Sequence, residues 1–366
     1  MIRILHLPGT LSLNNGRMHV IMNVYRKIDR SRFQFDFLAT DMEEKSFADE
    51  IHELGGKIYT IPKAQKNNFF QLLKALRNVL KSNAYPIVHY HATSQWVAVL
   101  FGLKRYNVEQ LIIHSHATVY SDSFIKSIRN FVLSLPMFLS GTKFIAATYE
   151  AGQNIFLNKK FEVIPNSIDT ERFNYNETAR NTIRNQLGLA ETDILLGNVG
   201  RYSKQKNQLF LINIFYNILK QPHRSNWFLL LVGQGSLKRK LIERATNLGI
   251  IDRIIFLTTQ ANIEHYYFAM DIFCFPSTYE GFGMVALEAQ ATGLPVVLSD
   301  VIPDAVKLRN SFELSLKSSD IDWSNLIISV SEIKHINRQE GVSLIKVAHM
   351  DSNSMVHQWE NLYSAM

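Results

Sequence analysis

The chain has 366 residues and a formal net charge of +7, with 46% hydrophobic and 19% charged residues. That length is sufficient for two domains of ordinary size, and that composition is typical of globular proteins. Cys274 is the only cysteine. A lone cysteine excludes an intramolecular disulfide and a cysteine-based metal site, and it agrees with a reducing cytosol.

The positive charge is concentrated in the first half of the chain. Residues 1–170 carry 20 Lys and Arg against 13 Asp and Glu, whereas residues 171–366 carry 19 of each group. The excess favours a domain that faces phosphates or a lipid surface, although ordinary scatter of charges would give the same sums. The basic residues do not cluster with aromatic residues in a recognisable module, so nucleic acid is not an expected partner. We expect neither a secretory signal nor a membrane span.

The first half alternates short apolar runs with helical patterns. Strands are expected at 2–7, 34–38, 57–61, 87–91, 111–116, 144–147 and 161–165, and helices at 18–28, 47–54 and 68–81. A strand, a glycine-bearing loop and a helix at the start predict a doubly wound α/β domain. Gly16 at the first helix entry suits a phosphate, and a simple turn explains it equally well.

Two of these strands end on His-x-His pairs, His89 with His91 and His114 with His116. Strand alternation places both histidines of a pair on one side, as metal ligands would be. We favour a polar strand end at a cleft, because no carboxylate lies within a few residues to complete a metal set. His116 is our candidate ligand contact, and structural roles are expected for His91 and His114.

Residues 121–139 mix many apolar side chains with Lys126 and Arg129, and Pro136 interrupts them. The pattern leaves three interpretations open: a lid, a pair of helices that face a bilayer, or a core helix.

A polar linker is expected from Asn166 to about Thr192, and a second domain of the same kind follows it. Its first strand, 194–200, leads to Gly200, Arg201 and Lys206. An arginine offers a fork of donors and a lysine a point charge, so this pair can hold a diphosphate; a solvated loop is the alternative. Strand 227–232 precedes Gly233 and Gly235, and residues 351–366 are expected to form a terminal helix.

The segment 275–300 carries two carboxylates, Glu280 and Glu288. It predicts a strand, a glycine loop, a helix over 284–291 and another strand. Glu280 then lies in the loop and Glu288 about two turns into the helix, on the order of 10 Å away. That spacing suits the two ends of one extended ligand. Glycines and a helix N-terminus between them suit phosphates, so a nucleotide-sugar fits.

Together these residues resemble the family 4 glycosyltransferases, which are retaining enzymes of the GT-B fold. The resemblance is specific in the second half, where it rests on Gly200-Arg201, Lys206, Gly233-x-Gly235, 275–277, 280–283, Glu288-Ala289 and 293–297. Residues 164–169 resemble the family's Ile-Pro-Asn-Gly-Val-Asp, with Ser167 in place of glycine. Residues 22–31 with 35–37 look like the exopolysaccharide and capsule branch.

The resemblance implies two Rossmann-like domains that face a cleft, with boundaries at 1–170 and 171–350 and a C-terminal helix, 351–366, that returns to the first domain. It implies that Arg201, Lys206, Glu280 and His116 are catalytic. The implied donor-binding residues are Gly16, Gly200, Gly233, Gly281, Phe282, Gly283, Met284, Val285 and Glu288. Asn15 replaces the first glycine of the family's Gly-Gly loop, and Met18 replaces an acidic residue. His114 lies close enough to His116 to leave their register open.

By this resemblance the chain is a retaining glycosyltransferase that needs no metal and moves a sugar from a nucleotide-sugar, expected to be UDP-linked. The acceptor would be lipid-linked or a glycan in bacterial surface polysaccharide synthesis. The enzyme would be cytoplasmic and peripheral on the inner face of the plasma membrane. The open alternatives are a nucleotide-sugar epimerase, a hydrolase, and a non-catalytic sugar-nucleotide binder.

Overall fold

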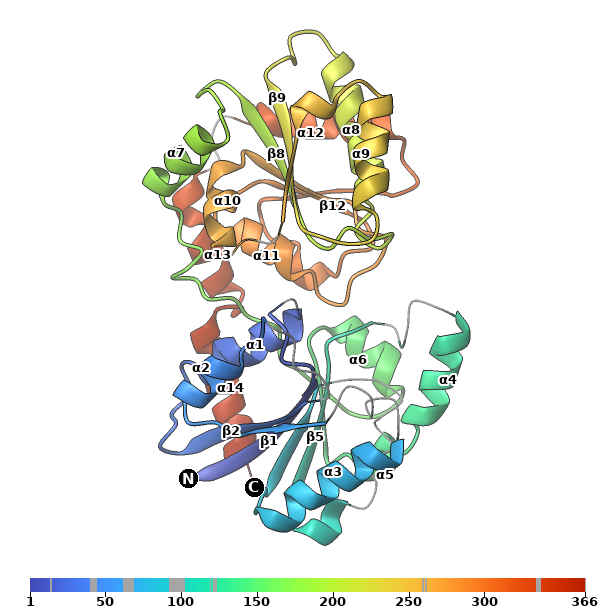
Figure 1. Ribbon diagram of the computed structural model, residues 1–366, viewed down its shortest axis with the longest axis vertical. Helices are drawn as coiled ribbons and strands as arrows, with labels where there is room; N and C mark the ends of the chain where they lie inside the picture. Colours follow the sequence, from blue (N-terminus) through green and yellow to red (C-terminus); the bar gives the residue numbers. More distant parts are fainter. Residues whose placement is uncertain are drawn as a thin grey trace. The chain divides into compact units, whose positions relative to one another are not determined.

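A computed structural model describes residues 1–13, 15–39, 45–61, 69–91, 103–118, 120, 124–258, 260, 262–333 and 337–365. These residues form two compact units (Figure 1). The first consists of Met1–Ile168 with His349–Met366, and the second of Asp169–Ala348. Each unit is a parallel sheet with helices on both faces, which confirms the predicted α/β class.

The first unit is built on a seven-stranded parallel sheet of order β3-β2-β1-β4-β5-β6-β7. Its strands are β1 (Ile2–Gly9), β2 (Phe33–Ala39), β3 (Ile58–Thr60), β4 (Ile87–Tyr90), β5 (Gln110–Ser115), β6 (Lys143–Ala146) and β7 (Glu162–Val163). The central strands are buried on both faces, as parallel sheets require. The order reverses between β1 and β4, where ligands bind in doubly wound sheets.

Helices cover both faces of this sheet (Figure 1). They are α1 (Gly16–Tyr25), α2 (Ala48–Glu53), α3 (Phe69–Ser82), α4 (Phe124–Ser134), α5 (Met137–Ser140), α6 (Tyr149–Phe156) and α14 (Ser352–Ser364). Helix α1 starts two residues earlier than predicted, because the Asn15 side chain caps it by accepting a hydrogen bond from the Arg17 backbone N–H. The predicted start of α3 at Asn68 lies outside the described residues.

The second unit repeats the plan with a six-stranded parallel sheet of order β10-β9-β8-β11-β12-β13. Its strands are β8 (Ile194–Val199), β9 (Trp227–Val232), β10 (Ile254–Leu257), β11 (Ile272–Phe275), β12 (Val296–Ser299) and β13 (Ser311–Leu314). Its helices are α7 (Glu177–Gln186), α8 (Gln208–Lys220), α9 (Lys238–Asn247), α10 (Ile263–Ala269), α11 (Met284–Ala291), α12 (Asp320–Ser331) and α13 (Gly341–Val347). Here the order reverses between β8 and β11.

The C-terminal helix α14 completes the first unit although it follows the second in sequence. Ile168 pairs with Asp351 in a parallel bridge, and the Ser352 backbone N–H donates to the Ile168 carbonyl at 3.0 Å. The helix buries Trp359 and Tyr363 completely. It therefore closes one face of the first sheet.

The prediction of a polar linker from Asn166 to Thr192 is wrong in one respect, because the segment contains helix α7. Asn176 caps this helix by accepting from the Ala179 backbone N–H at 2.9 Å. On its other side, Arg180 and Arg184 both form ion pairs with Asp271. The polar residues that suggested a linker thus attach a helix to the second sheet.

Two glycines after β9 support the loop that carries Arg201. The Gly200 backbone N–H donates to the Val232 carbonyl, and the Tyr202 backbone N–H donates to the Gln234 carbonyl, both at 2.9 Å. A Cβ on Gly233 would lie 2.0 Å from the Gly200 oxygen, and one on Gly235 would lie 2.4 Å from the Tyr202 oxygen. Only glycine allows the two loops to approach this closely.

We expect Gly233→Ala to destabilise the second unit by about 1–3 kcal/mol, since the added methyl group must push the Gly200 backbone away. Urea denaturation checks this. The control is Gln234→Ala, which removes an exposed side chain from the same loop and should change stability by less than about 0.5 kcal/mol. Equal stability of the two variants would contradict the contact.

Candidate functional site

The loop after β8 places two cations at the carboxyl end of the second sheet. Arg201 is exposed. The Lys206 ammonium nitrogen lies 2.7 Å from a Glu280 carboxylate oxygen and 4.6 Å from the centre of the Phe275 ring. Glu280 is only 8% exposed, so the ion pair is shielded from water. The structure thus brings Lys206 and Glu280 into direct contact.

The loop after β11 leads from Glu280 into α11. Gly283 has a φ of 98° and directly precedes the helix, a conformation that favours glycine. Phe282 is buried, whereas Gly281, Met284 and Val285 are partly exposed. Met284 is the first residue of α11, as predicted. The first backbone N–H groups of this helix are the kind of donors that bind phosphate.

Glu288 lies in the second turn of α11 and accepts a hydrogen bond from the Tyr267 hydroxyl at 2.9 Å. Burial raises the pKa of Glu288 to about 7, although the Tyr267 hydrogen bond and the Arg172 charge act in the opposite direction. The Glu288 carboxyl group therefore changes between its protonated and ionised forms near neutral pH. Tyr267 belongs to α10 and is fully buried.

In the first unit, Gly16 is the exposed first residue of α1. A Cβ added to Gly16 would have open space around it, with no neighbouring atom within 4 Å. Met18, which replaces an acidic residue of the family, is fully buried and packs in the core. Arg17 donates from its guanidinium to the His91 carbonyl at 3.0 Å, and burial lowers its pKa. A cation thus lies beside the strand ends that carry the histidines.

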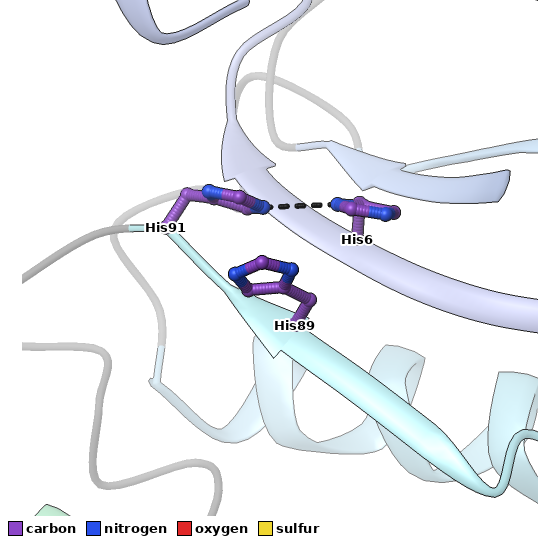
Figure 2. A group of neighbouring side chains, drawn as sticks. All are labelled: His6, His89 and His91. Atoms are coloured by element: carbon purple, nitrogen blue, oxygen red, sulfur yellow. Dashed lines mark hydrogen bonds between the residues drawn. The ribbon is translucent and has the colours of Figure 1, made fainter. Parts of the chain in front are cut away.

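The interpretation as a polar strand end at a cleft is wrong for His89, His91 and His114, and the burial of His91 and His114 agrees with the structural roles expected for them. His89, His91 and His114 are at most 1% exposed, and they gather with His6 of β1 beneath α14. Figure 2 shows His6 and His91 joined by a hydrogen bond, with the ring of His89 stacked beside them. Parallel strands β1, β4 and β5 place these side chains on one face. The sequence near the two pairs does not show that His6 lies beside them or that α14, from the far end of the chain, covers this face.

His116 retains some exposed surface, whereas His114 has none. One His116 ring nitrogen, Nδ1, lies 3.0 Å from the Asn166 amide oxygen, and the other, Nε2, lies 3.2 Å from His91. Burial and, to a smaller extent, the nearby Arg17 charge lower the pKa of His116 to about 3, although the Asn166 hydrogen bond acts in the opposite direction. His116 is therefore neutral at pH 7. Of the two histidines whose register was open, only His116 has exposed surface.

Sequence reasoning passed over four polar residues beside the candidates. They are His6, Arg17, Asn166 and Tyr267. Asn166 belongs to the segment 164–169 that carried the family resemblance, so its motif could have drawn attention to it. Tyr267 lies on a separate helix from Glu288, and no spacing in the sequence indicates that contact.

Two family models match the chain. One is described as Glycosyltransferase Family 4 and matches residues 15–172, and the other is described as Glycosyl transferases group 1 and matches residues 179–335. The matches divide near the boundary between the two structural units. Together they span most of the chain.

Relatives and solved structures agree with these models. EpsF of Bacillus subtilis (strain 168), named as a glycosyltransferase, is 29% identical over 83% of this chain and 80% of its own length. An Escherichia coli enzyme, UDP-Gal:alpha-D-GlcNAc-diphosphoundecaprenol alpha-1,3-galactosyltransferase, is 26% identical over 72% of this chain and 71% of its own. The crystal structure of HepE from Anabaena, in complex with UDP and glucose, superposes on this chain with a TM-score of 0.83 and 18% sequence identity. The match covers 100% of each of the two chains. The chain belongs to the family 4 glycosyltransferases.

Proposed function

We propose that this glycosyltransferase moves a sugar from a UDP-sugar to a lipid-linked or glycan acceptor, with retention at the anomeric carbon, in bacterial surface polysaccharide synthesis. The observation that carries the proposal is the group of charges beside the β8–β11 reversal. Arg201 and Lys206 follow β8, and Glu280 and Glu288 follow β11. Ligands of doubly wound sheets bind at such a reversal.

The donor would lie across the loops that follow β8, β9 and β11 and would reach Glu288 in α11. Arg201, Lys206, Gly200, Gly233 and the α11 N-terminus would hold the diphosphate, and Glu288 would accept hydrogen bonds from the ribose hydroxyls. Gly281, Phe282, Gly283, Met284 and Val285 would line the path between them. UDP is the nucleotide named for the E. coli relative and for the HepE structure, which supports a UDP-sugar here.

The first unit would bind the acceptor and would also contribute two donor contacts. Gly16 would contact the donor's phosphate, and His116 would contact the donor's sugar. A diphosphoundecaprenol acceptor is named for the E. coli relative, which supports a lipid-linked acceptor for this chain. The resemblance of residues 22–31 to the exopolysaccharide and capsule branch supports the same class.

In the proposed reaction, the bond between the anomeric carbon and the diphosphate oxygen breaks, and an acceptor oxygen bonds to the same face of that carbon. The acceptor's proton passes to the departing diphosphate. Arg201 and Lys206 stabilise the negative charge that grows on the diphosphate, so the proposal assigns no charge-stabilising role to a metal. Glu280 holds sugar hydroxyls.

The Lys206–Glu280 ion pair gives this arrangement a defined resting state. A lysine that is only 16% exposed would be costly to hold without a partner. Glu280 supplies the negative charge at 2.7 Å until a diphosphate arrives. Donor binding would then share Lys206 between the carboxylate and the phosphate.

An epimerase and a hydrolase make different products from the same donor, and a silent binder makes none. A screen of nucleotide-sugars that measures free nucleotide, free sugar and isomerised donor, with and without lipid-linked acceptors, separates them. Acceptor-dependent nucleotide release supports transfer. Stoichiometric free sugar without acceptor indicates hydrolysis, isomerised donor indicates an epimerase, and tight binding without any product indicates a binder.

We expect Arg201→Ala to lower kcat by about a hundredfold or more, because it removes charge stabilisation in the transition state. Nucleotide release with the donor found in the screen measures this. Lys204→Ala is the matched control, since it removes an exposed cation from the same loop. Near-normal turnover in the Arg201 variant would refute the assignment.

Donor affinity should depend on the protonation of Glu288. The ionised carboxylate accepts hydrogen bonds from ribose hydroxyls, so binding favours the form that prevails above pH 7. The dissociation constant of the UDP-sugar should therefore be about tenfold larger at pH 6 than at pH 8. In Glu288→Gln this dependence should vanish, as isothermal titration at several pH values would show. An unchanged pH profile in that variant would contradict the role of Glu288.

Peripheral membrane association belongs to the same proposal and is supported by α4 and α5. Their exposed apolar residues Ile125, Ile128, Val132 and Leu139 are between 52% and 81% exposed. These exposures exclude the interpretation of this segment as a core helix for the face that carries the four residues. Residues 121–123 of the segment lie outside the residues that the structure describes. The neighbouring cations Lys126 and Arg129 are also exposed. No helix among the described residues is long and apolar enough to cross a bilayer.

Apolar side chains flanked by cations suit an interfacial helix on an anionic lipid surface. We expect Ile125→Ser/Ile128→Ser/Leu139→Ser to reduce binding to anionic vesicles at least tenfold in a sedimentation assay. Lys126→Gln/Arg129→Gln should reduce binding to anionic vesicles by a similar factor and leave binding to neutral vesicles unchanged, because each cation contributes about 1 kcal/mol.

The control is Val347→Ser, which removes an equally exposed apolar side chain from the second unit. Its vesicle binding should match that of the unmodified protein. If the unmodified protein stays in the supernatant with anionic vesicles at low salt, the membrane part of the proposal is refuted.

A further inference from the structure

The carboxylate of Glu288 is held by one side chain from a neighbouring helix of the same unit. Tyr267 of α10 donates its hydroxyl proton to Glu288 Oε2 at 2.9 Å. The other carboxylate oxygen, Oε1, has no hydrogen-bond partner among the residues that the structure describes. Part of the Glu288 side chain is exposed. One oxygen is thus fixed by the protein, and the other is left for a ligand.

The position of the Tyr267 hydroxyl is set by the packing of its ring. The ring is fully buried and lies against Phe173 and Phe273, with centroids 6.0 and 5.6 Å away. The Arg338 guanidinium donates to the Tyr267 backbone carbonyl at 3.1 Å and holds the main chain of α10 at this point. The hydroxyl is therefore in place before a ligand arrives, and binding does not have to order it.

Tyr267 acts on the ionised Glu288 as a donor. Burial and the neighbouring carboxylate raise the pKa of the Tyr267 hydroxyl well above its ordinary value, so the hydroxyl keeps its proton. Burial raises the pKa of Glu288, and the hydrogen bond from Tyr267 opposes this by favouring the ionised form. The ionised carboxylate is the form that can accept hydrogen bonds at both oxygens. Without the tyrosine, Glu288 would stay protonated up to a higher pH.

Other ionisable groups act on this carboxylate through their charge. After burial and the tyrosine, Arg172 and Lys206 lower its pKa and Glu264 of α10 raises it. Arg172 and Glu264 form an ion pair at 2.7 Å, so their effects partly offset each other. Of the other elements packed against α11, α13 carries the exposed Lys346 and β11 carries the buried Cys274. Among the described residues, only the tyrosine fixes the direction of the carboxylate by a hydrogen bond.

We propose that Tyr267 is a positioning residue for the donor, which fixes Glu288 Oε2 and so presents Oε1 to the ribose hydroxyls. This inference rests on the proposed contact between Glu288 and the ribose. Tyr267 is fully buried, so it would not touch the donor itself. Its effect on binding should therefore vanish when either the carboxylate or the ribose hydroxyls are absent.

The test compares Tyr267→Phe with Tyr266→Phe in the full-length protein, with UDP as the ligand in isothermal titration. Phenylalanine keeps the packed ring and removes only the hydroxyl. Tyr266 is the matched control, because it lies on the same helix and its hydroxyl lies 3.4 Å from Gln260 instead. The terminal phosphate of UDP titrates in the same range, so the ratio of the variant's Kd to that of the unmodified protein is compared at each pH.

Loss of the hydrogen bond should raise the pKa of Glu288 by about one unit. The Kd ratio for Tyr267→Phe should therefore be about tenfold at pH 6 and about fivefold at pH 7. It should fall to about twofold or less at pH 9, where the carboxylate is ionised in both proteins and only its orientation differs. The ratio for Tyr266→Phe should stay near one throughout. A Tyr267→Phe ratio that does not change with pH would overturn the inference.

Two further measurements show whether the tyrosine acts through the carboxylate. In a Glu288→Ala background, adding Tyr267→Phe should change the Kd of UDP less than about twofold, because the contact is already lost. Dideoxy-UDP, which lacks both ribose hydroxyls, should bind the unmodified protein and Tyr267→Phe with equal affinity. Equal losses for UDP and dideoxy-UDP would indicate damaged packing and would contradict the positioning role.

The Glu288 carboxyl group can also be followed without a ligand by carbon-13 NMR. Its signal is the one that disappears in Glu288→Gln. The signal should titrate about one pH unit higher in Tyr267→Phe than in the unmodified protein or in Tyr266→Phe. Because this readout needs neither binding nor turnover, it decides the contact even if a variant binds UDP poorly. An unchanged titration in Tyr267→Phe would refute the inference.

The Glu288→Ala variant separates failure of the inference from failure of the proposed function. If Glu288→Ala leaves the Kd of UDP unchanged, the proposed contact with the ribose fails, and the positioning role fails with it. If Glu288→Ala weakens UDP binding while Tyr267→Phe binds UDP as the unmodified protein does at every pH, the inference alone is refuted and the proposed function stands.

Discussion

The close approach of the loops after β8 and β9 determines how the second unit presents its charges. Backbone hydrogen bonds join Gly200 to Val232 and Tyr202 to Gln234, and Gly233 leaves no space for a side chain. Because Arg201 stands between these two anchored residues, its backbone cannot shift without breaking one of them. Lys206 follows in the same loop and is held from the opposite side by Glu280. Arg201 is thus placed by main-chain geometry, whereas Lys206 is also held by its own ion pair.

The sequence predicted most where periodicity and punctuation agreed. The helix over Met284–Ala291 was predicted with its observed bounds, because Gly283 and Gly293 mark its ends and good helix formers lie between them. The linker prediction was wrong because Asn176 and the arginines of α7 look like loop residues until Asp271 is placed beside them. The contact of Tyr267 with Glu288 was beyond prediction, since it depends on how two helices pack.

The two units treat their polar groups differently. In the second unit, ionised groups meet as a shielded pair, Lys206 with Glu280. In the first unit, neutral imidazoles are joined by hydrogen bonds: His6 to His91, His91 to His116, and His116 to Asn166. The first solution suits a site that must bind and release a charged diphosphate.

Helix α14 also has a consequence for how the protein is made. The first unit needs residues 349–365 to cover the face of its sheet that carries His6 and His89, and these residues leave the ribosome after the whole of the second unit. The second unit consists of one continuous segment and has no such requirement. During synthesis the second unit therefore completes its core before the first, against the usual order from the N-terminus. Until then His6 and His89 lack the cover that Trp359 and Tyr363 of α14 give them.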